Sequence, residues 1–407
     1  MKNIFYIIAI SAAIVSCGTT TQGTQPMSQA TELTDSDREM ASEANKFSLK
    51  LFAQAYKDEK GNDNFCLSPL SASLALSMTA NGASGATREQ MYATLGFTGA
   101  EAEKINAYQQ KTIARLSTLD PERVTLNIAN SMWVNENFKI KKGFEKSNAK
   151  FYDASVKNIK FDQSAAKAIN DWCAQKTEGK ITEIVKEIDP MAQLFLINAL
   201  YFNSRWTTVF NKDRTKEETF TKENGERMKV QMMHQNTKIP YYENEYVQMA
   251  GKPFGDEYFE MLFILPRKGV TMDRCVEMLA DSLDVWNKAR EKEEVNLSLP
   301  RYKAEYGTSL KKTLLSMGMN DAFTSKANFD ALSNEALCIG DVLQKTFVKV
   351  EEEGAEAAAV TSVTLMTMSA RPSQPRNMVL NRPFIYIIRD RGTGNILFIG
   401  KNGCPKE

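Results

Sequence analysis

The chain of 407 residues is 43% hydrophobic, 25% charged and 9% aromatic, which is typical of a globular protein with a large core and excludes collagen, coiled coils and general disorder. The 51 Lys and Arg residues balance 50 Asp and Glu residues, so the net charge of +1 gives no reason to expect a nucleic-acid partner. His234 is the only histidine, which excludes zinc sites built from several histidines and most histidine-based relays.

The N-terminus carries a targeting segment. A short basic region over 1–3 precedes a twelve-residue apolar run over 4–15 that contains a single serine. As a helix this run is too short to cross a bilayer, which needs about 20 residues, but it has the length of a secretory hydrophobic region. The sequence Ile-Val-Ser-Cys at its end resembles the bacterial lipobox. We therefore expect a lipoprotein signal peptide over 1–16 and lipidation of Cys17; the alternative is an ordinary signal peptide with an incidental cysteine.

A polar segment follows the lipidation position. Residues 18–34 carry no charge before Glu32 and offer little to bury. A flexible chain of this length spans about 20–25 Å r.m.s., so residues 17–35 are expected to tether the folded part, 36–407, just off a membrane. We expect a lipoprotein of the bacterial outer membrane or cell surface, outside the cytoplasm.

The remaining cysteines indicate buried thiols rather than disulfides or metal ligands. They are five in number, more than sixty residues apart, and none belongs to a CxxC motif. Isolated cysteines behave as small hydrophobic residues. They are Cys66, Cys173, Cys275, Cys338 and Cys404.

Helical patterns dominate the first half of the chain. Ser36 is a candidate N-cap for a helix that continues to Gly61, with apolar residues every three or four positions. Ser68 followed by Pro69 predicts a second helix, because serine caps a helix and proline suits its first position. A third helical pattern starts at the beginning of 170–185.

Strand patterns dominate the second half. A turn at 392–395 folds the last two strands back on each other. No composition break or internal repeat follows residue 35, so we expect a single large α+β domain. The predicted strands cover residues 126–134, 194–202, 259–265, 294–299, 347–350, 384–388 and 396–399.

Motifs of common catalytic sites are absent. The sequence contains no GxSxG, GxxxxGK[ST] or HExxH motif, and no GxGxxG after a strand. The acidic triplet over 351–353 could serve acid–base chemistry or hold a cation, but a run of charges is more often solvated and no other group converges on it. We therefore expect neither an enzyme nor a cofactor or metal site.

The segment from Gly354 to Met368 has an unusual pattern. Every second residue from Ala355 to Thr367 is small or apolar, and residues 357–370 contain neither charge nor proline. This period of two predicts a strand with one face able to enter a core. A core strand is the simpler interpretation, but the alanine-rich first half has little intrinsic strand preference. Small residues on one face instead favour a strand that slides into a narrow, preformed gap.

Several other short motifs follow one another in a fixed order. Residues 354–359 (Gly-Ala-Glu-Ala-Ala-Ala), preceded by Glu352, resemble the hinge of the serpin family of serine protease inhibitors, and the whole resemblance covers residues 37–405. The further motifs are Asn64-Phe65 with Ser68-Pro69 and Ser71, Gly82-Ala83 with Gly85 and Thr87, Asn170 with Trp172 and Thr177, Asn198–Phe202 with Trp206, Asn381–Phe384, and Leu397–Lys401.

The resemblance implies three β-sheets, eight or nine helices and an exposed reactive-centre loop. It also implies suicide inhibition of serine endopeptidases, with cysteine endopeptidases as a second target class. In such inhibition the protease cleaves the loop, forms an acyl-enzyme and is carried along as the loop enters the main sheet. The implied hinge residues are Glu352, Gly354, Ala355, Glu356, Ala357, Ala358 and Ala359; the implied shutter and breach residues are Ser68, Ser71, Asn198, Trp206 and Gln344.

Gln344 departs from the family pattern. Serpins usually carry a shutter histidine ten residues before the hinge glycine, at the position of Gln344. Glutamine also donates and accepts hydrogen bonds, so we expect the network with Ser68, Ser71 and Asn198 to be kept. The pH response of a histidine would be lost.

In the usual serpin register, which counts fifteen residues starting with the hinge glycine, the reactive bond follows the fifteenth and is Met368–Ser369. Methionine there suits an elastase-like pocket. Arg371 would suit a trypsin-type protease, but Pro372 follows it; Met366 and Ala370 are further alternatives within the longer loop. We expect a monomer whose partners are a target serine protease and, through the lipid, a membrane. The alternative function is a non-inhibitory serpin that acts as a binding module.

Overall fold

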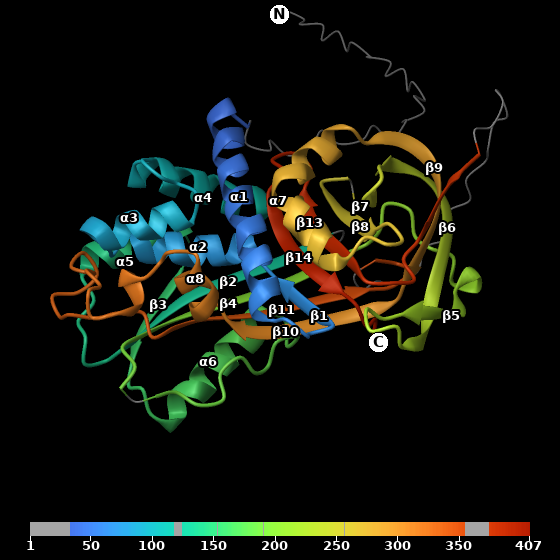
Figure 1. Ribbon diagram of the computed structural model, residues 1–407. Helices are drawn as coiled ribbons and strands as arrows, with labels where there is room; N and C mark the ends of the chain where they lie inside the picture. The colour runs from blue at the N-terminus through green and yellow to red at the C-terminus, as the bar shows by residue number, and fades with distance from the viewer. Residues whose placement is uncertain (1–32, 118–123, 153, 190, 256, 355–373) are drawn as a thin grey trace, which may run out of the picture.

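The computed structural model describes residues 33–117, 124–152, 154–189, 191–255, 257–354 and 374–407 (Figure 1). The predicted lipidation position Cys17 lies outside this part of the chain, and so do the hinge residues 355–359 and the predicted reactive bond Met368–Ser369. Gly354 is therefore the last described residue of the hinge.

Eight α-helices and fourteen strands make up the described part of the chain. The helices are α1 (Asp35–Asp58), α2 (Pro69–Ala80), α3 (Gly85–Thr94), α4 (Ala102–Ser117), α5 (Lys142–Tyr152), α6 (Gln163–Lys176), α7 (Met272–Lys288) and α8 (Lys311–Ser316). The strands are β1 (Asn64–Leu67), β2 (Val124–Asn135), β3 (Ser155–Ile159), β4 (Leu194–Ser204), β5 (Lys216–Thr221), β6 (Arg227–Glu243), β7 (Val247–Phe254), β8 (Phe259–Pro266), β9 (Glu291–Pro300), β10 (Tyr302–Ser309), β11 (Asp341–Val350), β12 (Arg376–Val379), β13 (Phe384–Asp390) and β14 (Ile396–Asn402).

Local sequence explains the helix starts. Ser68 caps α2 by accepting a hydrogen bond from the backbone of Ser71, and Pro69 occupies the first turn, as predicted. The prediction of Ser36 as the N-cap of α1 was wrong. The N-cap is Thr34, two residues earlier, which forms a reciprocal capping box with Asp37. Likewise α6 starts at Gln163, before the predicted pattern, because Asp162 caps it.

The strands form two hydrogen-bonded sheets. The five-stranded sheet has the order β10-β11-β4-β2-β3, and the nine-stranded sheet has the order β1-β14-β13-β8-β7-β6-β9-β12 with β5 on β6. The long strand β6 explains how three expected sheets appear as two. It pairs with β7 only over 241–243 and with β5 and β9 along the rest of its length, so it joins two strand sets into one. The α+β architecture is as predicted.

The five-stranded sheet separates two apolar layers. In β4, Leu196 and Phe202 belong to the main core, whereas the alternate residues Ile197 and Tyr201 belong to a second cluster with Ile169 of α6. Figure 1 shows α6 on one side of this sheet and α1 and α2 on the other. The alternation follows from the strand period of two. Each residue of β4 and β11 can therefore be assigned to one layer by its parity.

Candidate functional site

The centre of the five-stranded sheet is a parallel pair of strands. β11 pairs with β4 in parallel, from Asp341 opposite Phe195 to Phe347 opposite Tyr201. The other pairings of β11 and β4, with β10 and β2, are antiparallel. A strand that folded back after β11 and entered between β11 and β4 would run antiparallel to both. The sheet thus has one place where the segment following β11 could enter without breaking strand alternation.

Gly354 occupies the first position of that place. It forms antiparallel bridges to Glu351, which continues β11, and to Arg205, which continues β4. Two backbone hydrogen bonds join it to Glu351, with N–O distances of 2.9 and 3.2 Å. The residue numbers of Glu351 and Arg205 differ by 146, as 341 and 195 do in the β11–β4 ladder. Gly354 therefore has the register that a continuing strand would need.

Only glycine fits at position 354. Its φ is +136°, and a Cβ there would lie 2.2 Å from the carbonyl oxygen of Ser204 and 2.5 Å from the Cα of Arg205. Real Cβ atoms do not approach backbone this closely, and side chains disfavour this φ. The sequence therefore places glycine where the turn passes against the end of β4.

Trp206 connects this turn to the nine-stranded sheet. Its backbone N–H donates to the carbonyl of Glu353 and its indole Nε1–H donates to the carbonyl of Glu351, both at 2.9 Å. Phe210 donates its backbone N–H to the carbonyl of Glu352 at 2.8 Å. The Trp206 ring stacks on Phe254 with a centroid distance of 4.1 Å and is buried. The three backbone carbonyls of the acidic triplet thus all accept hydrogen bonds from the segment 206–210, which contains Trp206 and Phe210 and is called the aromatic segment below.

The middle carboxylate of the triplet is buried rather than solvated. The Glu352 side chain is 2% exposed, and its oxygens accept hydrogen bonds from Arg301 Nε at 2.8 Å and from Thr215 Oγ1 at 2.5 Å. Burial alone would raise the pKa of this carboxyl, but the Arg301 guanidinium and the Thr215 hydroxyl hold the pKa below its usual value. The Glu352 carboxylate is therefore charged and fixes the hinge to Arg301 and Thr215. The expectation that the acidic triplet is solvated was wrong for this residue.

The shutter position Gln344 is paired with the start of α2. Its Oε1 accepts from the backbone N–H of Ser68 at 2.9 Å, and its Nε2 donates to the carbonyl of Ser68 at 2.8 Å. The Ser68 hydroxyl accepts from Ser71 N–H at 3.4 Å. Asn198 lies opposite Gln344 in the β11–β4 register. One amide group thus satisfies both backbone groups of Ser68, with no group that titrates near neutral pH.

Comparison with known proteins identifies the family. The family model described as Serpin (serine protease inhibitor) matches residues 42–405. The chain belongs to the serpin family. An uncharacterized serpin-like protein of Thermococcus kodakarensis is 34% identical over 359 residues, 86% of this chain and 83% of that protein. Serpin B6 of Macaca fascicularis is 34% identical over 381 residues, 90% of this chain and 100% of that protein.

Solved serpin structures share the fold. The thermophilic serpin tengpin, in its native state, has a TM-score of 0.83 at 36% identity and covers 90% of this chain and 94% of its own. Human thyroxine-binding globulin, solved with thyroxine, has a TM-score of 0.84 at 26% identity and covers 91% of this chain and 100% of its own. The family is one of protease inhibitors, and these neighbours include a protein that binds a small molecule.

Some residues of the serpin site were not found from the sequence. Arg301 and Thr215 hold Glu352, and Arg205 and Phe210 hold the backbone around it, yet none of them stands out in the chain. Arg301 lies 51 residues before its partner, so no local spacing connects the two. The acidic triplet was the available signal, because a buried carboxylate requires a cationic partner.

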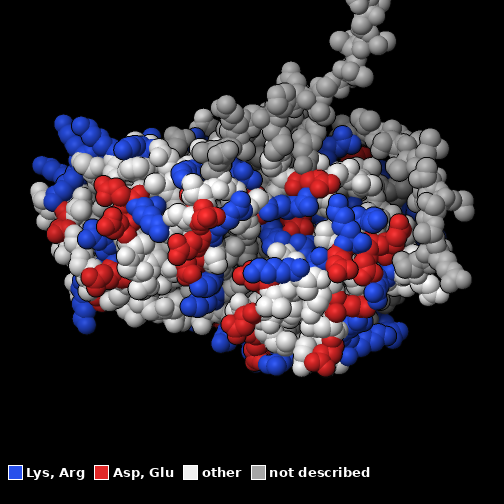
Figure 2. Space-filling model, turned by 90° about the horizontal axis from the view of Figure 1, so that it is seen from above, with Lys and Arg blue, Asp and Glu red and all other residues white. Residues whose placement is uncertain are grey.

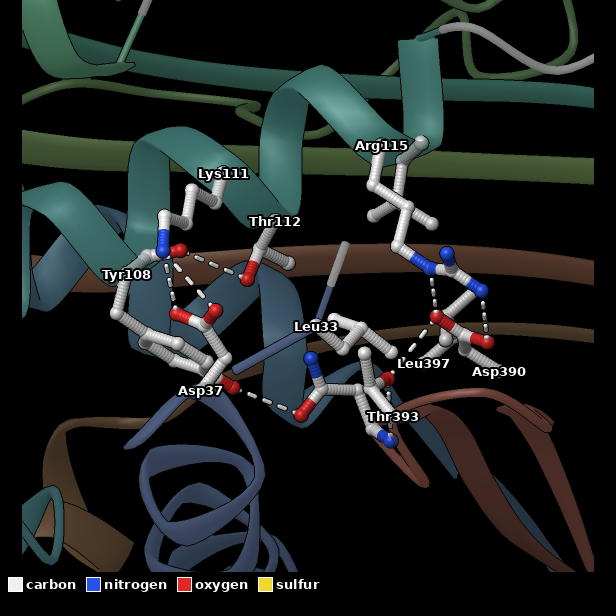
Figure 3. Close-up of a pocket in the computed structure, with 11 residues that line it drawn as sticks. Leu33, Asp37, Tyr108, Lys111, Thr112, Arg115, Asp390, Thr393 and Leu397 are labelled. Carbon is white, nitrogen blue, oxygen red and sulfur yellow. Dashed lines mark hydrogen bonds and ion pairs between the residues drawn. The ribbon is translucent and has the colours of Figure 1, made fainter. Parts of the chain in front are cut away.

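A small pocket lies between α1, α4 and the β13–β14 turn (Figure 3). The cavity holds about 20 Å³, which suits one water molecule rather than a small-molecule ligand. Ion pairs close two of its walls: Lys111 with Asp37 at 2.9 Å, and Arg115 with Asp390 at 2.7 Å. The Lys111–Asp37 pair joins α4 to α1 and the Arg115–Asp390 pair joins α4 to β13, so these residues have a structural role.

Proposed function

We propose that this chain is an inhibitory serpin that traps a serine endopeptidase, with cysteine endopeptidases as a second target class. The protease attacks Met368–Ser369, forms an acyl-enzyme and is displaced as the cleaved loop enters the sheet between β11 and β4. Met368 at the reactive bond favours an elastase-like protease. The protein acts as a monomer.

The position of Gly354 is the observation that carries this proposal. Because Gly354 already bridges both strands in the β11–β4 register, the following residues can pair by separating the two strands sideways. If the inserted strand continued this register, Ala357 would lie between Val348 of β11 and Phe202 of β4, which both belong to the main core. The small hinge residues that share parity with Ala357 would then face the main core, where large side chains would not fit. A binding module would not require this parity.

Loop insertion also gives a favourable balance of hydrogen bonds. The inserted strand replaces the one β11–β4 ladder with two ladders, and each additional hydrogen bond contributes about 1 kcal/mol. The apolar side chains that share parity with Ala357 add burial at about 0.8 kcal/mol per CH₂. The total approaches the stability of a whole domain, about 5–15 kcal/mol. It is large enough to distort a protease that remains attached.

The test is incubation of the purified protein with elastase, trypsin and a papain-type protease. The wild type is expected to form an SDS-stable complex with elastase, and mass spectrometry is expected to place the cut after Met368. Ala359→Arg places a charge opposite Thr346, which is fully buried, so the loop should be cut without complex formation. Glu356→Arg introduces the same side chain at the outward parity, opposite the partly exposed Lys349, and should still form the complex.

Two outcomes would contradict the proposal. A wild type that is cleaved by every protease without forming a complex would favour the binding-module function. Equal inhibition by Ala359→Arg and Glu356→Arg would show that the loop does not enter the core. A cut elsewhere in 365–371 would change the reactive bond and leave the inhibitory mechanism intact.

The cellular location belongs to the same proposal. We infer a lipid on Cys17 that holds the serpin at the surface of a bacterial envelope, as the lipobox-like sequence indicates. No helix in the described part of the chain is long and apolar enough to span a bilayer. Basic and acidic side chains are interspersed over the face shown in Figure 2. In this proposal the lipid on Cys17 supplies the membrane affinity.

A further inference from the structure

A lysine is buried beneath the aromatic segment that holds the hinge. Lys252 lies on β7 and is only 1% exposed. Its Nζ donates to the carbonyl of Thr208 at 2.8 Å and to Oε1 of Gln235 at 2.5 Å. The same nitrogen lies 4.7 Å from the ring centroid of Phe210 and 5.4 Å from that of Trp206. Lysine is almost never buried in this way without a partner charge.

The described polar partners of Lys252 carry no charge. Its two acceptors are a backbone carbonyl and a side-chain amide, and its Nζ also faces the rings of Trp206 and Phe210. The charged groups on neighbouring elements are engaged elsewhere: Glu352 with Arg301, and Glu353 with Lys212. On β8, Glu260 pairs with Arg290 and Arg389. No described carboxylate forms an ion pair with Lys252, and burial lowers the pKa of this lysine to about 7.

Lys252 lies against the rings of Trp206 and Phe210, the two residues whose backbone and indole N–H groups hold the hinge. Trp206 binds the carbonyls of Glu351 and Glu353, and Phe210 binds that of Glu352. A movement that lifted these rings from Lys252 would also disturb the hydrogen bonds that Trp206 and Phe210 donate to residues 351–353. The same movement would admit water to the amine. Opening of the breach and hydration of Lys252 are therefore coupled through two side chains.

We propose that protonation of Lys252 controls the opening of the breach. The neutral amine favours the closed sheet, and the protonated amine favours separation of β11 from β4. The opened breach is the state that would admit the loop, so the proposal adds regulation to the proposed function. The opening itself needs neither a protease nor cleavage, and can be measured without them.

The sign follows from the linkage between protonation and opening. In the closed state the pKa of Lys252 is about 7, whereas a hydrated lysine has a pKa of about 10.4. Opening therefore takes up a proton between these values, and its equilibrium constant rises as the pH falls. For a fully hydrated open state, the constant increases about 50-fold from pH 9 to pH 7 and about two-fold from pH 7 to pH 6. Most of the response lies above neutral pH.

Hydrogen exchange of β11 measures the opening directly. Exchange of residues 341–350 would be followed by mass spectrometry at pH 6, 7, 8 and 9 in the full chain, in Lys252→Met and in Lys268→Met. The ratio of wild-type to variant exchange at each pH cancels the intrinsic pH dependence of exchange. Relative to Lys252→Met, the wild type should exchange increasingly fast from pH 9 to pH 7, by up to about 50-fold. Lys268→Met removes an exposed lysine and should follow the wild type.

Two further measurements keep the proposal testable if Lys252→Met fails to fold. In NMR spectra, the lysine ¹³Cε resonance that disappears in Lys252→Arg is assigned to Lys252 and should titrate near pH 7 in the wild type. In the second measurement, β11 of Lys252→Arg should exchange rapidly at every pH, because the charge of arginine is permanent. A constant exchange ratio between pH 6 and 9, or a Lys252 resonance that titrates above pH 10, would overturn the proposal. Failure to inhibit any protease would count against the proposed function and leave these measurements unaffected.

Discussion

Substitution of Gly354 by alanine tests whether the hinge is already seated in the sheet. The new Cβ would meet three backbone atoms of β4 and its continuation, at 2.2, 2.5 and 2.8 Å. These atoms belong to Ser204, Arg205 and Trp206, so the contact cannot be relieved by a rotamer change. Either the end of β4 or the turn at Gly354 must move. We expect the turn to move, because Trp206 is stacked on Phe254.

The magnitude has two parts. Holding a non-glycine residue in this backbone region costs about 1–3 kcal/mol. Movement of the turn also breaks the two hydrogen bonds between Gly354 and Glu351, at about 1 kcal/mol each. Gly61→Ala is a matched control, since Gly61 has a φ of +105° and nothing lies within 4 Å of a Cβ there. The control isolates the backbone cost, and Gly354→Ala should exceed it by about 2 kcal/mol or more.

Urea unfolding of both variants would measure this difference. Protease assays should also show that Gly354→Ala is cleaved as a substrate more often than the wild type, whereas Gly61→Ala partitions as the wild type does. If Gly354→Ala loses no more stability than Gly61→Ala, the bridge between Gly354 and Arg205 does not form in solution. Gly354 would then not hold the register of an inserting strand.

The remaining predictions concern four other positions. The pKa of Glu352 is held below its usual value by Arg301, so its stabilisation is complete above about pH 4.5 and is lost as the pH falls further; Glu352→Gln should remove this part of the pH dependence of unfolding. Gln344→His should make stability decrease by about 1–3 kcal/mol as the pH falls below about 6.5, because a charged imidazole cannot accept from Ser68, while the wild type shows no such step. Met368→Arg should gain inhibition of trypsin and lose inhibition of elastase in rate measurements; unchanged selectivity would place the reactive bond elsewhere. Wild-type protein should incorporate palmitate and partition into detergent, and Cys17→Ala should do neither; equal labelling would disprove the lipobox interpretation.

Much of the fold could be predicted from the sequence because local patterns determine it. The Ser68–Pro69 start of α2 and the apolar strand 194–202 appear where their residue types predict them. The start of α1 could not be chosen this way, since Thr34 and Ser36 are both acceptable caps. Their difference lies in whether Asp37 can reach back to the cap, which is a question of geometry.

The candidate site was only partly predictable for a related reason. Gln344 could be expected to keep the shutter bonds, but its pairing with the backbone of Ser68 depends on how α2 meets β11. The partners of Glu352 and Lys252 lie between 17 and 137 residues away in the chain, so no local spacing predicts these contacts. Lys252 lies outside every strand predicted from the sequence, so no pattern singles it out. The reactive bond and the lipid lie outside the described residues and stay predictions.

The seated Gly354 has a kinetic consequence for a trap of this kind. After cleavage, insertion competes with hydrolysis of the acyl-enzyme, and the slowest part of strand formation is ordinarily the first pairing, which must immobilise a free chain end. If the chain is inhibitory as proposed, the bridges of Gly354 to Glu351 and Arg205 already supply this first pairing, and only the propagation of the strand competes with hydrolysis of the acyl-enzyme. Gly354→Ala should therefore introduce a delay before insertion begins, whereas Ala359→Arg should let it begin and then arrest it. Stopped-flow measurements of loop insertion would distinguish the two, since Gly354→Ala should show a lag before insertion and Ala359→Arg should show insertion that starts and then stops.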